Sequence, residues 1–172
     1  MSTITDLTVE DRVAIQELLA RYCRFFDAGF VDAFVACFAS DCTIVEERME
    51  DEVYWHGHDG VRRLLAHYHG TPSLAGRRHH VGRVFMEREG QSVAVKSFSL
   101  VTECHGEPPN QLQFAGFYLD DVVKRETRWV FKTRVIRRWD TEALKPIPGR
   151  WRWAPEPGRA GPGGRLERDE RA

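Results

Sequence analysis

The sequence has little that would direct the protein to a membrane or to nucleic acid. Its apolar runs fall well short of the roughly 20 residues that a membrane-spanning helix needs. The formal net charge of −1 gives no overall attraction to nucleic acid or anionic lipid. The segment from Met1 to Glu10 lacks the basic-then-apolar layout of a secretion signal. These absences predict a cytoplasmic protein with no membrane partner and no nucleic-acid partner.

Motifs for nucleotide binding and nucleophilic catalysis are also missing. The chain has no GxGxxG after a predicted strand, no GxxxxGK[ST] and no GxSxG. We therefore expect no cofactor. Cysteine is sparse and carries no CxxC spacing, which predicts reduced thiols rather than disulfides. The four cysteines are Cys23, Cys37, Cys42 and Cys104.

What is present indicates a globular domain, since 42% of the residues are hydrophobic and 30% are charged. Helical stripes come first, beginning after a capping-box-like Thr8 and including a third helix that Asp59 could cap. Two-residue alternation follows over four long segments. The expected helices are Val13–Phe26, Val31–Ala39 and Val61–His69, and the expected strands are Cys42–Glu46, Tyr54–Gly57, His79–Glu89, Ser92–Cys104, Gln111–Lys124 and Trp129–Trp139. This order predicts the α+β class, with helices packed on one face of a bent sheet.

The last part of the chain has a different composition. Thr141 to Ala172 holds five of the eight prolines, is rich in Gly and Arg, and offers only Trp151 and Trp153 as large apolar anchors. Such composition is typical of disorder. We expect one domain over residues 1–140 and a mostly disordered tail over 141–172.

Asp27 is the first candidate for chemistry. It continues the ridge Leu19, Cys23, Asp27 beside the apolar stripe of the first helix. A carboxylate that is partly removed from water there would be a candidate base. The alternative is that Asp27 simply ends the helix before Gly29.

His79 and His80 open the first long strand, and a neutral imidazole can pass protons near neutral pH. Neighbouring strand residues point to opposite faces, so at most one of the two can face a pocket under the helices. Strict alternation groups His79 with Val81, Arg83 and Phe85, and groups His80 with Gly82, Val84 and Met86. Two half-exposed histidines with no role are the other possibility.

The remaining histidines form two HxH pairs, His56 with His58 and His67 with His69. A metal site would need a third ligand, and residues i and i+2 of a helix diverge by about 200°. We therefore expect no metal.

In order and spacing, several motifs resemble the SnoaL-like branch of the nuclear transport factor 2-like superfamily. They are Arg21-Tyr-Cys-Arg-Phe-Phe-Asp27, Phe34-Val-Ala-Cys-Phe-Ala-Ser-Asp41, His56-Gly57 with Gly60, Arg78-His-His-Val-Gly82 and Trp129-Val-Phe-Lys with Arg134. The resemblance covers about residues 8–140. It implies a cone-shaped α+β barrel, in which three N-terminal helices pack on the concave face of a strongly bent, mixed or antiparallel sheet.

Members such as scytalone dehydratase and bile acid 7α-dehydratase imply roles for individual positions. The resemblance implies catalytic roles for Asp27, for His79 or alternatively His80, and for Tyr22. This sequence departs from the family pattern at Arg83, where many members carry Asn, and near Glu46, where scytalone dehydratase supplies a tyrosine. The expected substrate-binding residues are Phe26, Glu46, Trp55, Arg83, Phe114 and Tyr118.

The resemblance implies a cofactor-independent dehydratase, isomerase or cyclase acting on a small, largely apolar cyclic or polyketide- or steroid-like molecule. It also implies a homodimer or homotrimer. Two other readings stay open: a non-catalytic β subunit of a ring-hydroxylating dioxygenase, and a domain that binds a small molecule without turnover.

Overall fold

The computed structural model describes residues 7–47, 51–74, 76–104 and 110–139. The expected tail over 141–172 lies outside these residues. Helices precede a run of long strands, which confirms the α+β class. The helices are α1 (Val9–Ala28), α2 (Val31–Val35) and α3 (Gly57–Gly70), and the strands are β1 (Phe38–Glu47), β2 (Glu52–His56), β3 (Arg77–Glu89), β4 (Ser92–Glu103), β5 (Gln111–Arg125) and β6 (Arg128–Arg138).

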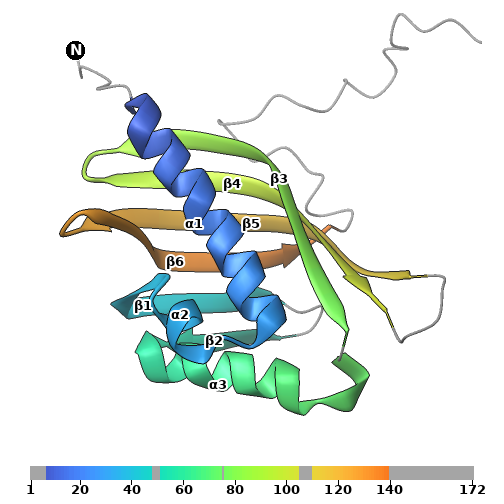
Figure 1. The fold of residues 1–172 in the computed structure, drawn as a ribbon. Coiled ribbons are helices and arrows are strands. Elements are labelled where there is room, and N and C mark those ends of the chain that lie inside the picture. The colour runs from blue at the N-terminus through green and yellow to red at the C-terminus, as the bar shows by residue number, and fades with distance from the viewer. Residues whose placement is uncertain (1–6, 48–50, 75, 105–109, 140–172) are drawn as a thin grey trace, which may run out of the picture. The chain divides into compact units, whose positions relative to one another are not determined.

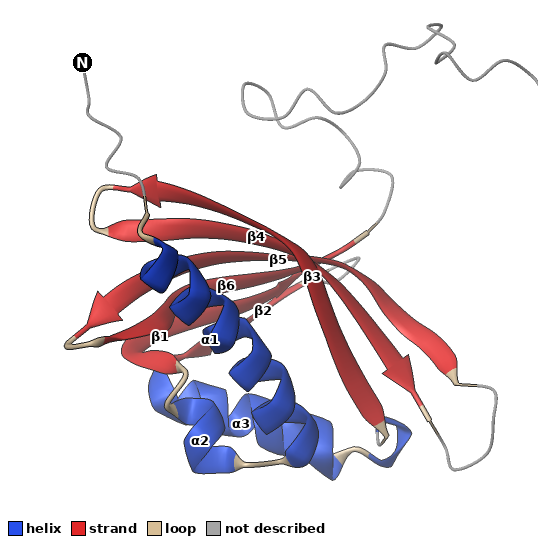
Figure 2. Ribbon diagram, turned by 45° about the horizontal axis from the view of Figure 1, so that its top comes forward, coloured by secondary structure: helices blue, strands red, loops and turns tan. Residues whose placement is uncertain are grey.

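The six strands form one curved sheet in the order β2-β1-β6-β5-β4-β3. Every neighbouring pair is antiparallel except β1 and β6, which run parallel. All three helices lie on one face of the sheet (Figure 1), and the bend of the sheet is clear in a second view (Figure 2). The bend brings β3 against α1. The predicted arrangement of helices on a bent sheet is confirmed.

The caps of α1 fix where the helix begins and ends. Thr8 accepts a hydrogen bond on its hydroxyl from the backbone N–H of Asp11, at 3.1 Å, as the capping-box pattern predicts. At the other end Gly29 adopts φ 70°, a left-handed conformation that glycine reaches without a Cβ penalty. The chain therefore reverses directly after Asp27 and Ala28. The buried face of α1 carries Ile15, Leu18, Leu19, Tyr22 and Phe26.

Two predicted helix boundaries are wrong. The second helix stops at Val35 rather than Ala39, because Phe38 pairs with Phe131 of β6 and starts β1 instead. Sheet pairing overrides the short helical stripe there. The third helix starts at Gly57, with His56 as its N-cap, and Asp59 lies inside the first turn rather than capping it.

The strict alternation predicted for β3 is also wrong beyond Gly82. The pairing with β4 shifts register between Gly82 and Phe85, and Arg83 adopts φ 50°. This bulge inserts a residue and exchanges the faces of the strand. Val84 and Met86 therefore pack against the core with Val81, on the face of His79. Arg83 and Phe85 are exposed.

Candidate active site

Asp27 and His79 meet between the end of α1 and the start of β3. The backbone N–H of His79 donates to Oδ2 of Asp27 at 3.0 Å, and Nδ1 of the same histidine lies 2.5 Å from Oδ1. The His79 side chain is 6% exposed and that of Asp27 is 15% exposed. Both carboxylate oxygens are thus used to hold one residue, which fixes the orientation of the ring.

The hydrogen bond at Nδ1 determines which atom of His79 is available. When a carboxylate accepts from Nδ1–H, Nε2 is the atom that can take up or release a proton. Nε2 has no hydrogen-bond partner among the described residues, and His79 lines a cavity. Two aromatic rings enclose the imidazole of His79 in edge-to-face arrangements. The ring centre of Phe26 lies 4.7 Å from the imidazole centre, and that of Tyr22 lies 6.2 Å from it.

His80 lies on the other face of β3. Its side chain is exposed, and Nε2 contacts the hydroxyl of Thr102 at 3.0 Å. Only His79 of the two histidines faces the helices.

The cavity has a volume of about 320 Å³. Its walls come from α1, α3 and the concave face of the sheet, and they mix aromatic rings with a few polar groups. Its lining residues are Tyr22, Phe26, Glu46, Leu64, Tyr68, Arg77, His79, Val101, Gln113, Phe114, Tyr118, Ile136 and Arg138. A small, mainly apolar molecule with a few polar substituents would match such a lining.

The two buried tyrosines of this lining keep their phenol groups protonated near neutral pH. Tyr22 and Tyr118 are each 1% exposed. Burial raises the pKa of Tyr22 far above its ordinary value of 10.0, and burial likewise raises the pKa of Tyr118. Their hydroxyls can donate hydrogen bonds but do not serve as bases.

A buried ion pair between Arg134 and Asp120 packs against the rings of these two tyrosines. Nε and Nη2 of Arg134 donate to the two carboxylate oxygens of Asp120 at 2.7 and 2.8 Å, and both side chains are 0% exposed. The guanidinium carbon lies 3.9 Å from the centre of the Tyr22 ring and 4.4 Å from that of Tyr118. Burial alone would lower the pKa of Arg134, but the facing carboxylate raises it above its ordinary value. Arg134 is therefore a permanent cation.

Glu46 is a buried carboxylate that lines the cavity. Its side chain accepts from the hydroxyl of Tyr68 at 2.5 Å and from Nε1 of Trp55 at 3.1 Å. The neighbouring Glu47 points to the other face of β1 and pairs with Arg137. Trp55 contacts Glu46 and is not among the residues that line the cavity.

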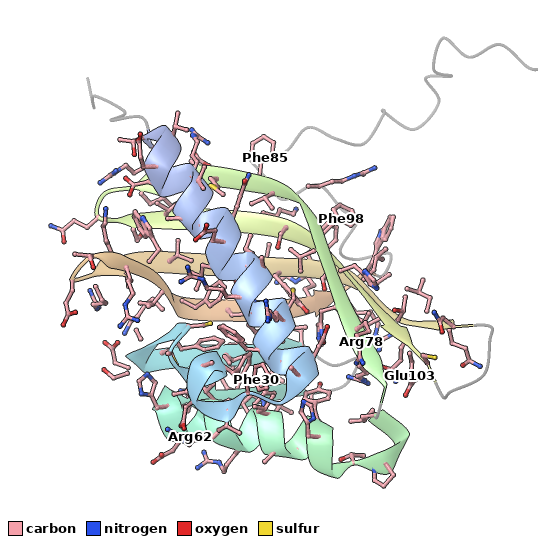
Figure 3. All side chains as sticks on the ribbon, viewed as in Figure 1. Phe30, Arg62, Arg78, Phe85, Phe98 and Glu103 are labelled. Atoms are coloured by element: carbon pink, nitrogen blue, oxygen red, sulfur yellow. The ribbon has the colours of Figure 1, made fainter. Side chains whose placement is uncertain are left out.

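The expected residues Phe26, Glu46, Phe114 and Tyr118 line the cavity, together with Tyr22 and His79. Arg83 does not, because the bulge turns it outward, where its guanidinium lies 5.4 Å from the ring centre of Phe98. Figure 3 labels Phe98 beside β3. Sequence reasoning missed seven lining residues, four of which carry polar groups: Tyr68, Arg77, Gln113 and Arg138. Arg77 could have been found, since it lies two residues before His79 and shares its face.

One histidine of each HxH pair contacts a backbone carbonyl group. Nε2 of His58 contacts the carbonyl oxygen of Phe38 at 3.0 Å, and Nε2 of His69 contacts that of Phe26 at 2.7 Å. Within the described ranges, no three His, Cys, Asp or Glu side chains gather as a metal site would require. Also within these ranges, no helix is long and apolar enough to cross a membrane.

An α+β fold in which helices and a curved sheet enclose a cavity, with an Asp–His pair beside it, defines a class of small-molecule pocket proteins. The chain belongs to the SnoaL-like family: the model of the SnoaL-like domain matches residues 7–135. The family predicted from the sequence is confirmed. Among curated proteins, none matches the sequence.

Solved structures share the fold. A proposed scytalone dehydratase from Novosphingobium aromaticivorans is 23% identical, with a TM-score of 0.61, over 83% of this chain and 96% of that chain. The β subunit of a proposed aromatic-ring-hydroxylating dioxygenase from the same species is 19% identical, with a TM-score of 0.63, over 78% and 95%. A protein of unknown function from Mycobacterium tuberculosis is 21% identical, with a TM-score of 0.66, over 75% and 72%. At these identities the likeness shows the fold alone.

Proposed function

We propose that the protein is a cofactor-independent lyase or isomerase, acting as a dehydratase, isomerase or cyclase on a small cyclic substrate with a largely apolar body. The observation that carries this proposal is His79 in the wall of the cavity, held by Asp27 behind it, with Nε2 of His79 available to a ligand. Asp27 orients the imidazole and stabilises its protonated form.

The proposed reaction starts at a carbon next to a carbonyl group. Nε2 of His79 takes the proton, and the C–H electron pair moves into an enolate whose oxygen accepts a hydrogen bond from Tyr22. In an elimination, the enolate electrons expel a β-hydroxyl group, which leaves as water with the proton from His79. In an isomerisation, the same proton returns to another carbon.

Hydrogen–deuterium exchange tests this step before the natural substrate is known. In D₂O the protein should accelerate exchange of the α protons of a cyclic ketone such as 1-indanone, followed by NMR. Asp27→Asn and His79→Ala should each lower the catalysed rate by roughly 10²–10⁴. His80→Ala is the matched control, because it removes a neighbouring imidazole on the opposite face, and it should retain the rate. Equal rates in all four proteins would contradict the proposal.

A second candidate is a non-catalytic subunit, supported by the fold shared with the dioxygenase β subunit and by an aromatic cluster on the outer sheet face. The ring centre of Phe98 lies 4.7 Å from that of Phe117 and 5.4 Å from that of Trp139. Trp139 is 45% exposed. The same cluster supports a homodimer or homotrimer. Light scattering of the purified chain distinguishes the homo-oligomer from the non-catalytic subunit. A stable homo-oligomer supports self-association, and a monomer favours a β subunit that lacks its α partner.

A further inference from the structure

Arg77 and Arg138 line the cavity, and neither forms an ion pair within the described chain. Nε of Arg77 is buried and has no hydrogen-bond partner among the described residues, while its guanidinium carbon lies 4.8 Å from the ring centre of Tyr68. The guanidinium carbon of Arg138 lies 5.6 Å from the ring centre of Phe114. Stacking on a ring leaves the N–H donors of an arginine free to bind an anion.

The two arginines approach the cavity from the same end of the sheet. Arg77 is the first residue of β3 and pairs with Glu103 near the end of β4, whereas Arg138 is the last residue of β6 and pairs with Gly116 of β5. Figure 3 shows Glu103 at this end, where β3 begins and β4 ends. The lining therefore carries two cations at one end and mainly apolar and aromatic side chains further in.

The carboxylates nearest to this end already have other partners. Glu46 accepts from Tyr68 and Trp55, and Glu103 accepts from Nε2 of Gln113 at 2.8 Å. Both carboxylates are thus hydrogen-bonded to other groups, and neither forms an ion pair with Arg77 or Arg138. A carboxylate supplied by a ligand could bind a guanidinium through two parallel, charge-assisted hydrogen bonds, as Asp120 does with Arg134.

We infer that the ligand of this cavity is a carboxylic acid: an apolar ring body with an ionised carboxylate held by Arg77 and Arg138. This inference rests on the proposed function for the use of the site and adds the class of substrate. Arg77 lies two residues from His79 on the same strand face, so their Cα atoms are roughly 7 Å apart. The carbon that faces His79 is then only a few bonds from the carboxylate, which makes a cyclic hydroxy acid or keto acid the substrate class.

Binding of a matched probe pair tests the inference without turnover. The acid 2-naphthoate and its neutral amide, 2-naphthamide, have nearly the same shape and differ in charge. Calorimetric titration of the whole chain should show that the acid binds at least about tenfold more tightly, since hydrogen bonds to charged groups are the stronger kind. The preference should decrease as salt is added.

Three variants assign the preference to the arginines. Arg77→Met and Arg138→Met should each remove most of the difference between acid and amide, while Arg83→Met, on the outer face of the same strand, should keep it. Circular dichroism confirms that each variant is folded. If the acid binds the wild-type protein no more tightly than the amide, or if both cavity variants keep the preference, the inference is wrong.

These failures can be told apart from failure of the proposed function. Exchange of a neutral ketone depends on Asp27 and His79 and requires no carboxylate. Asp27→Asn should lose exchange but still prefer the acid. Loss of acid preference with intact exchange would overturn only the inference, and unchanged exchange in Asp27→Asn with intact preference would overturn only the proposed function.

Discussion

The guanidinium of Arg134 lies over the face of the Tyr22 ring, with its central carbon 3.9 Å from the ring centre. Phe131, at 4.0 Å, lies against the same group, and Asp120 neutralises it from the side. A charged pair at 0% exposure thus occupies the core directly behind the cavity. Such a pair loses its hydration on folding, so its value depends on both partners being present.

Breaking this pair should strongly destabilise the fold. Arg134→Met or Asp120→Leu alone should each lower the free energy of unfolding by about 3–5 kcal/mol, because each leaves an uncompensated buried charge. The double variant should recover most of that loss, since two apolar side chains then replace two charges. Urea unfolding of the four proteins measures the difference, and additive losses in the double variant would contradict this account.

Asp11 should make stability depend on pH. Its Oδ1 accepts from Nε1 of Trp129 at 2.9 Å and from Nζ of Lys124 at 3.0 Å, and these hydrogen bonds, that of Trp129 foremost, lower the pKa of Asp11 below its ordinary 3.8. A carboxylate with a lowered pKa stabilises the fold above pH 3.8, and this contribution is lost as the pH falls through the folded-state pKa.

The comparison is with Asp11→Asn, which removes the charge. The wild-type protein should be more stable by about 1 kcal/mol near neutral pH, and the difference should shrink as the pH falls through the lowered folded-state pKa of Asp11. Glu10→Gln is the control, because Glu10 is an exposed carboxylate in the same turn. Thermal unfolding at several pH values measures the effect. A difference that persists at low pH would show that packing, not charge, is responsible.

The resemblance to the family implied catalytic roles for Asp27 and for His79 or His80, whereas strand alternation alone left the choice between the two histidines open. The outward turn of Arg83 could not be anticipated, since a bulge depends on pairing with β4 and leaves no signature in hydrophobic alternation. The Arg134–Asp120 pair was missed for a similar reason. Their contact requires the register of β5 against β6, which places Asp120 opposite Arg134.

The cysteines should differ sharply in reactivity. Burial raises the pKa of Cys23 and of Cys37 to about 11, and burial also raises that of Cys42, whereas Cys104 is exposed. The thiolate is the reactive form, so only Cys104 should react quickly with a disulfide reagent such as DTNB near neutral pH. Cys104→Ser should abolish the fast phase, and unfolding in urea should expose the remaining thiols. A fast phase that survives Cys104→Ser would contradict the buried assignment.

Tyr22 should contribute as a hydrogen-bond donor and not as a base. It differs from Tyr118, which also lines the cavity, in lying against the His79 ring, with centres 6.2 Å apart. Tyr22→Phe should therefore lower the rate of ketone exchange by roughly 10²–10³, the usual effect of removing one donor to a developing oxyanion. Tyr118→Phe is the matched control and should have the smaller effect.

The pH dependence separates the two possible roles of Tyr22. Because burial holds its pKa well above 10.0, the hydroxyl stays protonated across the working range, and its ionisation produces no change in exchange rate up to about pH 10. A tyrosine acting as a base would instead make the rate rise toward alkaline pH, and the rise would be absent from Tyr22→Phe. Rate profiles of the wild-type protein and Tyr22→Phe should therefore run parallel, with a constant ratio between them. A ratio that grows with pH would assign proton abstraction to Tyr22 and leave His79 as an orienting group.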